Sequence, residues 1–186
     1  MKIIYLCGAH TSGKTTILKA IEQLDDVDFV GGEIGKDLYY QRKFKTDNQK
    51  ESFELEVTEL ELRRDNKIIN SNFNCSVVET WHIGNLAYAM VRNPDCEKKL
   101  VEMIKTSPLL NSSLGIWLQV SRENIYARTQ TFNDNRSWAA DFYSKIDFKI
   151  ADCFKILNLA NHIIVDANGE LNTVINDVKN IIKLNM

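Results

Sequence analysis

The stretch Gly8-Ala9-His10-Thr11-Ser12-Gly13-Lys14-Thr15 decides the fold, because it fits the pattern G-x-x-x-x-G-K-[ST] at each fixed position. Residues 2–7 precede it and form an apolar, β-prone run, which is typical of a strand buried on both faces. Residues 16–24 follow it, with apolar side chains at the spacing of a helix. This pattern carries meaning when it joins a buried strand to a helix, as it does here.

The residue types of this loop suit the binding of phosphate groups. Glycines let the backbone turn so that successive N–H groups point at phosphate oxygens, and the next helix adds the partial positive charge of its N-terminus. We expect Lys14 to supply an ammonium group for the β and γ oxygens, and the Thr15 hydroxyl to serve as a ligand of Mg²⁺. The residues predicted to bind the nucleotide are Gly8, Ala9, His10, Thr11, Ser12, Gly13, Lys14, Thr15 and Thr16.

Short apolar runs alternate with helical patterns along the whole chain. Beyond residues 2–7, strands are predicted at 27–30, 76–78, 115–120 and 162–166. Helices are predicted at 16–24, 49–66, 83–92, after Pro94, at 122–128, at 137–160 and over a closing segment from about 174. This alternation indicates an α/β protein with the three-layer P-loop NTPase fold, a five-stranded parallel sheet flanked by helices with a short lid.

Composition sets further bounds on the protein. The chain has 186 residues, 44% apolar and 26% charged, which predicts one ordered domain over residues 1–186. A net charge of −2 gives no basic surface of the kind that selects duplex nucleic acid or an anionic membrane. Apolar runs reach about five residues, far short of the ~20 of a membrane helix, and four widely spaced cysteines suggest free thiols. We therefore expect a cytoplasmic protein without a membrane partner.

Three acidic residues follow predicted strands, where ligands of open α/β sheets bind. Glu79 follows the third strand directly, where a carboxylate can hold Mg²⁺ through water or receive a substrate proton; alternatively, it caps the next helix. Glu33 follows a Gly-Gly turn and could accept a hydrogen bond or a proton from a substrate hydroxyl; alternatively, it is a solvated loop acid. Asp166 is assigned to the turn before the last helix, near the expected position of an adenine.

Two arginines, Arg128 and Arg136, flank a polar segment between two predicted helices. Phosphoryl transfer needs mobile cations that close over the γ-phosphate and exclude water. We therefore predict a lid at residues 128–137. The alternative is a solvated connection between helices.

Other side chains could face a substrate, namely residues 39–43, Phe53 with Glu54, and Trp81 with His82. The alternatives are that residues 39–43 belong to a helix surface and that Phe53 belongs to the core.

Taken in order, these motifs resemble the thymidylate kinase and deoxynucleoside kinase group of P-loop kinases over most of the chain. The resemblance rests on residues 8–15, on Glu79 with residues 85–88, on residues 118–123 followed by Arg128, and on residues 165–167. It implies a five-stranded parallel sheet, ATP, Mg²⁺ and transfer of the γ-phosphoryl group to a nucleoside or nucleoside monophosphate. It also implies that Glu79 matches the acid of the Asp-Arg-Tyr or Glu-Arg-Ser motif and that Glu33 lies where deoxynucleoside kinases place a catalytic base.

The chain departs from that pattern at Thr80, where the family has an arginine. Arg42, Arg92 or Arg122 could replace this cation, or the acceptor differs from a thymidine nucleotide.

We therefore predict an ATP-dependent kinase of the nucleoside or nucleotide class with a small-molecule acceptor. Its predicted catalytic residues are Lys14, Glu79, Arg128, Glu33 and Arg136, and its predicted metal ligands are Thr15 and Glu79. Two alternatives stay open, namely an ATPase or switch module and a kinase that acts on a base or end within a nucleic acid; the lid-like segment disfavours the first and the near-neutral charge the second. A homodimer is also left open, since related kinases often dimerise through helices.

Overall fold

Five parallel strands form the centre of the molecule, in the order β2-β3-β1-β4-β5. The computed structural model describes residues 2–41, 51–129 and 136–186. The strands are β1 (Lys2–Cys7), β2 (Phe29–Gly31), β3 (Cys75–Glu79), β4 (Leu114–Gln119) and β5 (His162–Asp166). The first strand lies in the middle and pairs with β3 on one side and β4 on the other. The strand order reverses at β1, and ligands of open α/β sheets bind beyond the carboxyl ends of strands at such a point.

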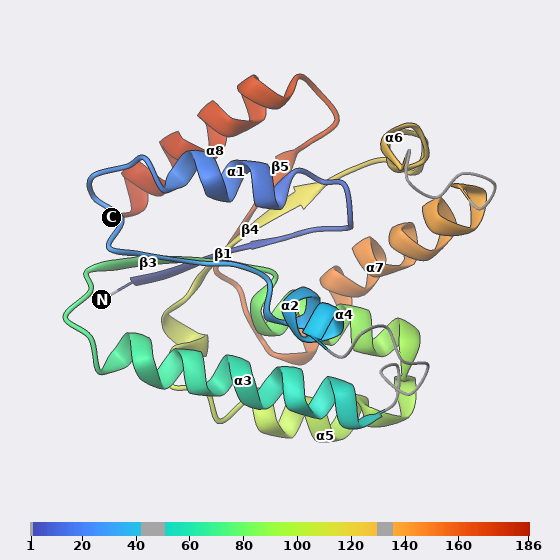
Figure 1. The fold of residues 1–186 in the computed structure, drawn as a ribbon, viewed down its shortest axis with the longest axis horizontal. Coiled ribbons are helices and arrows are strands. Elements are labelled where there is room, and N and C mark those ends of the chain that lie inside the picture. The colour runs from blue at the N-terminus through green and yellow to red at the C-terminus, as the bar shows by residue number, and fades with distance from the viewer. Residues whose placement is uncertain (1, 42–50, 130–135) are drawn as a thin grey trace.

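Helices cover both faces of the sheet (Figure 1). On one face lie α1 (Lys14–Ile21) and α8 (Leu171–Asn185), and on the other lie α3 (Glu51–Ile69), α4 (Trp81–Arg92), α5 (Glu97–Ile104) and α7 (Arg136–Ile156). Two shorter helices, α2 (Ile34–Gln41) and α6 (Arg122–Arg128), follow β2 and β4. Single 3-10 turns span Pro94–Cys96 (η2) and Leu110–Ser112 (η3).

Side chains of the central strand β1 pack into two separate hydrophobic cores, one on each face of the sheet. Ile3, Tyr5 and Cys7 belong to the core beneath α3, α4, α5 and α7, whereas Ile4 and Leu6 belong to the core beneath α1 and α8. All five side chains are fully buried, as the uninterrupted apolar pattern predicts. This burial fixes the position of the loop that leaves β1 at residue 8.

The predicted fold class is confirmed, since five parallel strands are flanked by helices on both faces. The helix α2 was not predicted, because three glycines between residues 31 and 35 suggested a loop. Its Leu38 is buried against Phe53 and Val57 of α3, so tertiary packing stabilises this helix. The strand β2 lies at 29–31 instead of 27–30, because Phe29 pairs in register with Ser76 of β3. Among the described residues, none of the helices has the length and apolar character to cross a bilayer.

Candidate active site

A cavity of about 790 Å³ lies where the chain leaves β1, β2, β3 and β5. Its volume falls in the range of small-molecule sites in proteins. Residues lining it include four of the five predicted catalytic residues, namely Lys14, Glu33, Glu79 and Arg128. The structure thus brings together side chains that are up to 114 positions apart in the sequence.

The loop at residues 8–15 wraps one wall of this cavity. Gly8 has φ +151°, and a Cβ there would lie 2.5 Å from the carbonyl oxygen of Leu118, so a larger residue does not fit. Gly13 has φ +92° and directly precedes α1, whose N-terminus therefore faces the cavity. This arrangement offers backbone N–H groups and a helix dipole to an anion.

Lys14 is buried in this loop and is 5% exposed. Its Nζ donates hydrogen bonds to the carbonyl oxygens of Gly8 (3.0 Å) and Ala9 (2.9 Å). These two bonds hold the ammonium group against the loop at the cavity wall, where it can neutralise phosphate oxygens.

The two predicted metal ligands contact each other. Thr15 Oγ1 donates to Glu79 Oε1 at 2.8 Å, and Glu79 is 2% exposed. Glu79 ends β3, and its register partner on β1 is Leu6, so the pairing of these strands sets its side chain beside the loop. The residue at the N-cap of α4 is Thr80, whose side chain forms no cap hydrogen bond, so Glu79 is engaged with Thr15 rather than with the helix end.

This oxygen pair fits Mg²⁺, which prefers hard oxygen ligands and is usually held in phosphate-transfer sites by one or two protein side chains plus phosphates and water. Within residues 2–41, 51–129 and 136–186 there is no cluster of three or more His, Cys, Asp or Glu that could hold a metal ion by itself. A metal at Thr15 and Glu79 would therefore depend on the bound phosphates to complete its coordination.

Glu33 lies on the same cavity, two residues beyond the end of β2. Burial raises the pKa of its carboxyl group, and the nearby Glu79 raises it further, while Lys14, Lys36 and Arg92 act in the opposite direction. A carboxylate with a raised pKa is a stronger base than an ordinary glutamate. The position and the pKa both suit a group that accepts a proton from a substrate.

Arg128 also lines the cavity. It lies at the end of α6, which follows β4, whereas Glu33 follows β2 on the other side of the central strand β1. Its guanidinium donates to the carbonyl oxygens of Thr11 (3.4 Å) and Asn168 (3.1 Å), so it bridges the loop after β1 and the turn after β5. Arg136 is the first residue of α7, but its side chain and residues 130–135 of the predicted lid lie outside the described part of the chain.

The turn after β5 supplies the less polar part of the cavity. Leu171 and Val174 line it, and Leu171 is 44% exposed. Asp166 accepts hydrogen bonds from the backbone and side chain of Asn168, so it builds this turn, as predicted, and does not itself line the cavity.

Sequence reasoning missed Lys36 as a lining residue. It lies on α2, and since that helix was not predicted, the register that turns Lys36 toward the cavity was unknown. A lysine three residues after Glu33 was the available signal.

Of the two described arginines considered as substitutes at the acceptor side, Arg92 acts to lower the pKa of Glu33. Its guanidinium makes two hydrogen bonds to Glu54 (3.0 and 2.9 Å) and lies over the rings of Phe53 and Tyr88. Arg122 instead pairs with Asp141 on the surface. Arg42 lies outside the described residues.

Trp81 and His82 do not line the cavity, contrary to the possibility raised from the sequence. Both are buried beneath α3, where their ring nitrogens contact Asp65.

Comparison with solved structures identifies the fold. The structure matches a deoxyadenosine kinase from M. mycoides solved with bound dATP, with a TM-score of 0.69, 17% identity and full coverage of both chains. It matches a thymidylate kinase from Ehrlichia chaffeensis with a TM-score of 0.68, 15% identity and coverage of 97% and 98% of the two chains. A thymidylate kinase from Candida albicans also has a TM-score of 0.68, with 17% identity and coverage of 98% and 91%. The chain has the fold of the P-loop nucleoside and nucleotide kinases.

The similarity to these kinases is detected by comparing structures and not by comparing sequences. No model of a protein family matches the sequence, and no curated protein matches it either. Sequence identities of 15 to 17% over nearly complete chains mean that the arrangement of strands and helices is kept while most side chains differ.

Proposed function

We propose that this protein is an ATP-dependent kinase that transfers the γ-phosphoryl group to a nucleoside or a nucleoside monophosphate. The observation that carries this proposal is that Lys14, the Thr15–Glu79 pair, Arg128 and Glu33 all face one cavity. Phosphoryl transfer requires little covalent chemistry from a protein but many positioned charges, and this cavity supplies them. The kinases named for the similar structures support the same class of reaction.

The proposed reaction forms one bond to the γ-phosphorus and breaks one. An oxygen of the acceptor forms a bond to the γ-phosphorus, the bond to the oxygen that bridges the β- and γ-phosphates breaks, and ADP leaves with that oxygen. Lys14 and Arg128 stabilise negative charge on the transferring group, and the loop N–H groups hold the remaining phosphates. Mg²⁺, held by Thr15 and Glu79, would neutralise charge on the β- and γ-phosphates.

The position of Glu33 favours a hydroxyl acceptor. A hydroxyl group must lose a proton as it attacks phosphorus, so it benefits from a base, whereas a monophosphate offers an oxygen that is already deprotonated at neutral pH. Glu33, on the cavity wall with a raised pKa, can receive that proton. The missing arginine at position 80 points the same way, since an anionic acceptor would need that cation more than a neutral one.

The test is a transfer assay with ATP labelled at the γ-phosphate. Candidate acceptors are nucleosides, nucleoside monophosphates, nicotinamide riboside and oligonucleotides, each with and without Mg²⁺. We expect label on a nucleoside in the first place, and none with Lys14→Ala. Steady release of free phosphate with label on none of the acceptors would overturn the kinase assignment and support an ATPase or switch module.

A matched control for Lys14→Ala is Lys19→Ala. Lys19 lies on the same helix, α1, and is exposed at its last turn, so its loss leaves the cavity unchanged. Equal loss of transfer in both variants would mean that the effect of Lys14→Ala comes from the helix and not from phosphate binding.

A further inference from the structure

A buried side chain of α3, Arg64, contacts the turn that carries Glu33. Arg64 is 9% exposed, and its Nη1 donates to the carbonyl oxygen of Gly32 at 2.7 Å. Gly32 is the residue directly before Glu33. A Cβ at the neighbouring Gly31 would lie 3.1 Å from Arg64 Nη1, so the glycine there leaves room for the guanidinium.

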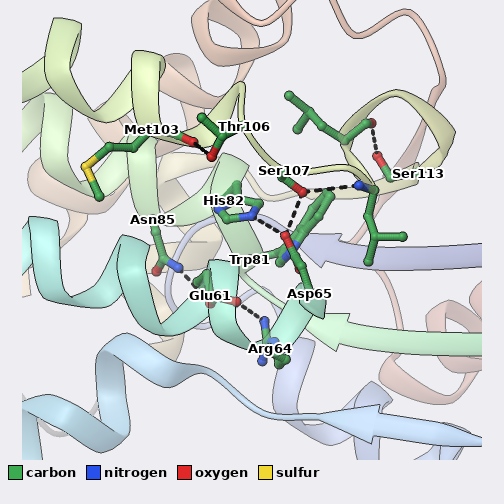
Figure 2. Close-up of polar contacts among 12 residues, drawn as sticks. Glu61, Arg64, Asp65, Trp81, His82, Asn85, Met103, Thr106, Ser107 and Ser113 are labelled. Carbon is green, nitrogen blue, oxygen red and sulfur yellow. Dashed lines mark hydrogen bonds and ion pairs between the residues drawn. The ribbon is translucent and has the colours of Figure 1, made fainter. Parts of the chain in front are cut away.

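The other terminal nitrogen of the Arg64 guanidinium contacts Glu61, one turn earlier on α3. Arg64 Nη2 forms an ion pair with Glu61 Oε2, and Glu61 is fully buried (Figure 2). The other carboxylate oxygen of Glu61 accepts a hydrogen bond from Asn85 Nδ2 of α4 at 2.9 Å. One hydrogen bond from Nη1 and one ion pair at Nη2 restrict how the planar guanidinium can turn.

The same group of residues reaches the other side of Glu33. A Cβ at Gly35 would lie 3.4 Å from Asn85 Oδ1, so the first turn of α2 packs against that amide. Gly32, directly before Glu33, thus accepts from Arg64, and Gly35, two residues after Glu33, lies beside Asn85, while Glu61 connects the two side chains.

Contacts of Asp65 fix the position of α3 relative to Glu79, the second acid of the site. Asp65, the neighbour of Arg64, is fully buried and accepts hydrogen bonds from Trp81 Nε1 (2.9 Å) and Ser107 Oγ (2.6 Å), and it contacts His82 Nε2 at 2.7 Å (Figure 2). Trp81 follows Glu79 by two residues, and both Thr80 (φ +68°) and Trp81 (φ +47°) have left-handed backbone, which costs energy unless the surroundings hold it. Asp65 therefore ties α3 to the turn after Glu79.

We infer that Arg64 is a positioning residue for Glu33, which it holds at a fixed place relative to Glu79 by anchoring the β2–α2 turn to α3. This inference rests on the proposed function in so far as Glu33 acts on an acceptor. Arg64 does not line the cavity, so it acts through the turn and not through substrate.

The test compares Arg64→Met with Arg63→Met. Arg63 is the adjacent residue of the same helix, but its side chain is 71% exposed, so the control removes an equal charge without touching the turn. The first readout is amide hydrogen exchange of the segment 32–41, which includes the bond from the Asp37 amide to the Glu33 carbonyl (3.3 Å). We expect exchange in this segment to rise at least tenfold in Arg64→Met, with the control at the rate of the parent.

The second readout is the ratio of acceptor phosphorylation to ATP hydrolysis. A misplaced Glu33 slows attack by the acceptor but leaves ATP binding intact, so we expect this ratio to fall at least tenfold in Arg64→Met, with the KM for ATP within twofold of the parent. In Arg64→Lys, the single ammonium group can reach only one of the two partners, Gly32 or Glu61. The ratio for this variant should therefore lie between those of the parent and Arg64→Met. A general loss of folding would raise exchange in β1 as well, so the ratio is measured under conditions in which β1 exchanges at the parent rate.

The two readouts separate the inference from the proposed function. Unchanged exchange in segment 32–41 would overturn the anchoring role, and unchanged ratio despite faster exchange would overturn the role in positioning Glu33. If the parent protein phosphorylates none of the acceptors, the proposed function fails, and the exchange result alone then decides whether Arg64 anchors the turn.

Discussion

At the scale of single residues, the Thr15–Glu79 contact leads to a sharp prediction. Glu79→Gln keeps an oxygen that can accept from Thr15 Oγ1 but removes the negative charge that we propose holds Mg²⁺. We expect kcat to fall by roughly 100-fold, the order of effect seen when one electrostatic group of an active site is lost, with ATP affinity nearly unchanged. Steady-state kinetics at several Mg²⁺ concentrations measures this.

Glu59→Gln is the control for this variant. Glu59 is exposed on α3 and does not line the cavity, so the kcat of this control should stay at the parent value. A Glu79→Gln enzyme within a few-fold of the parent would show that Glu79 serves neither metal nor acceptor.

Glu33 gives a second prediction at this scale. Glu33→Gln removes the carboxylate that we propose acts as the base, so phosphorylation of a hydroxyl acceptor should fall by roughly 100-fold, within the usual 10²–10⁴ range for general-base catalysis, while any transfer to a monophosphate is far less affected. In the parent, kcat toward the hydroxyl acceptor should fall as the pH drops through the raised pKa of Glu33, because the protonated group cannot accept a proton. Loss of both activities to the same extent would assign Glu33 to binding instead of proton transfer; Asp37→Asn, exposed on α2, is the matched control.

These residues also show how far sequence reasoning reaches. The loop at 8–15 is predictable because its chemistry is local, and Glu79 and Glu33 are predictable because both follow β-prone runs and strand ends meet at one edge of a sheet. The contact of Arg64 with Gly32 was not predictable, since it depends on how α3 packs over the sheet, and the residues are 32 positions apart.

At the scale of elements, α7 contacts the loop after β1 at two positions one turn apart. Tyr143 stacks on His10 with ring centroids 4.9 Å apart, and Asp147 accepts a hydrogen bond from Trp117 Nε1 at 2.9 Å, while the Ala9 backbone acts to lower the pKa of the Asp147 carboxyl group. The helix α7 thus packs against the loop after β1. The helix α2 was not predicted, and its Leu38 packs against α3.

Asp147 makes this connection sensitive to pH. Burial raises the pKa of its carboxyl group from 3.8 to about 6, so the folded protein favours the neutral form, and stability present at low pH is lost as the pH rises through 6. Between pH 4 and pH 7.5, the free energy of unfolding of the parent should fall relative to Asp147→Asn by up to about 3 kcal/mol, at ~1.4 kcal/mol per pKa unit. Urea denaturation at several pH values measures the difference.

The control for this prediction is Asp141→Asn, on the same helix. Asp141 is half-exposed and pairs with Arg122 at the surface, where such pairs contribute little, so its pH profile should follow that of the parent. Glu61, whose pKa burial raises to about 7, acts in the same direction but is present in all three proteins and cancels in the comparison. Parallel profiles for the parent and Asp147→Asn would contradict the prediction.

At the scale of the whole molecule, the cavity joins segments that the sheet order keeps apart. Its walls come from residues after β1, β2, β3 and β5, together with Arg128 at the end of α6, so a ligand there contacts both halves of the sheet. A five-stranded parallel sheet could be expected from the α/β pattern, but which side chains meet at the cavity depends on the pairing registers of the strands, which a single sequence does not define.

A ligand that bridges both halves should stabilise the fold as a unit. At a MgATP concentration 100 times its Kd, binding to the folded state alone adds about 2.7 kcal/mol, which for a chain of this size raises Tm by roughly 5–11 °C. Lys14→Ala should lose most of this shift, since it removes the ammonium group at the cavity wall, while its Tm without nucleotide stays close to that of the parent. Differential scanning fluorimetry with ATP, ADP and Mg²⁺, alone and combined, measures the shift, and Lys19→Ala should keep it in full. An equal rise of Tm in the parent and in Lys14→Ala would place the nucleotide elsewhere on the molecule.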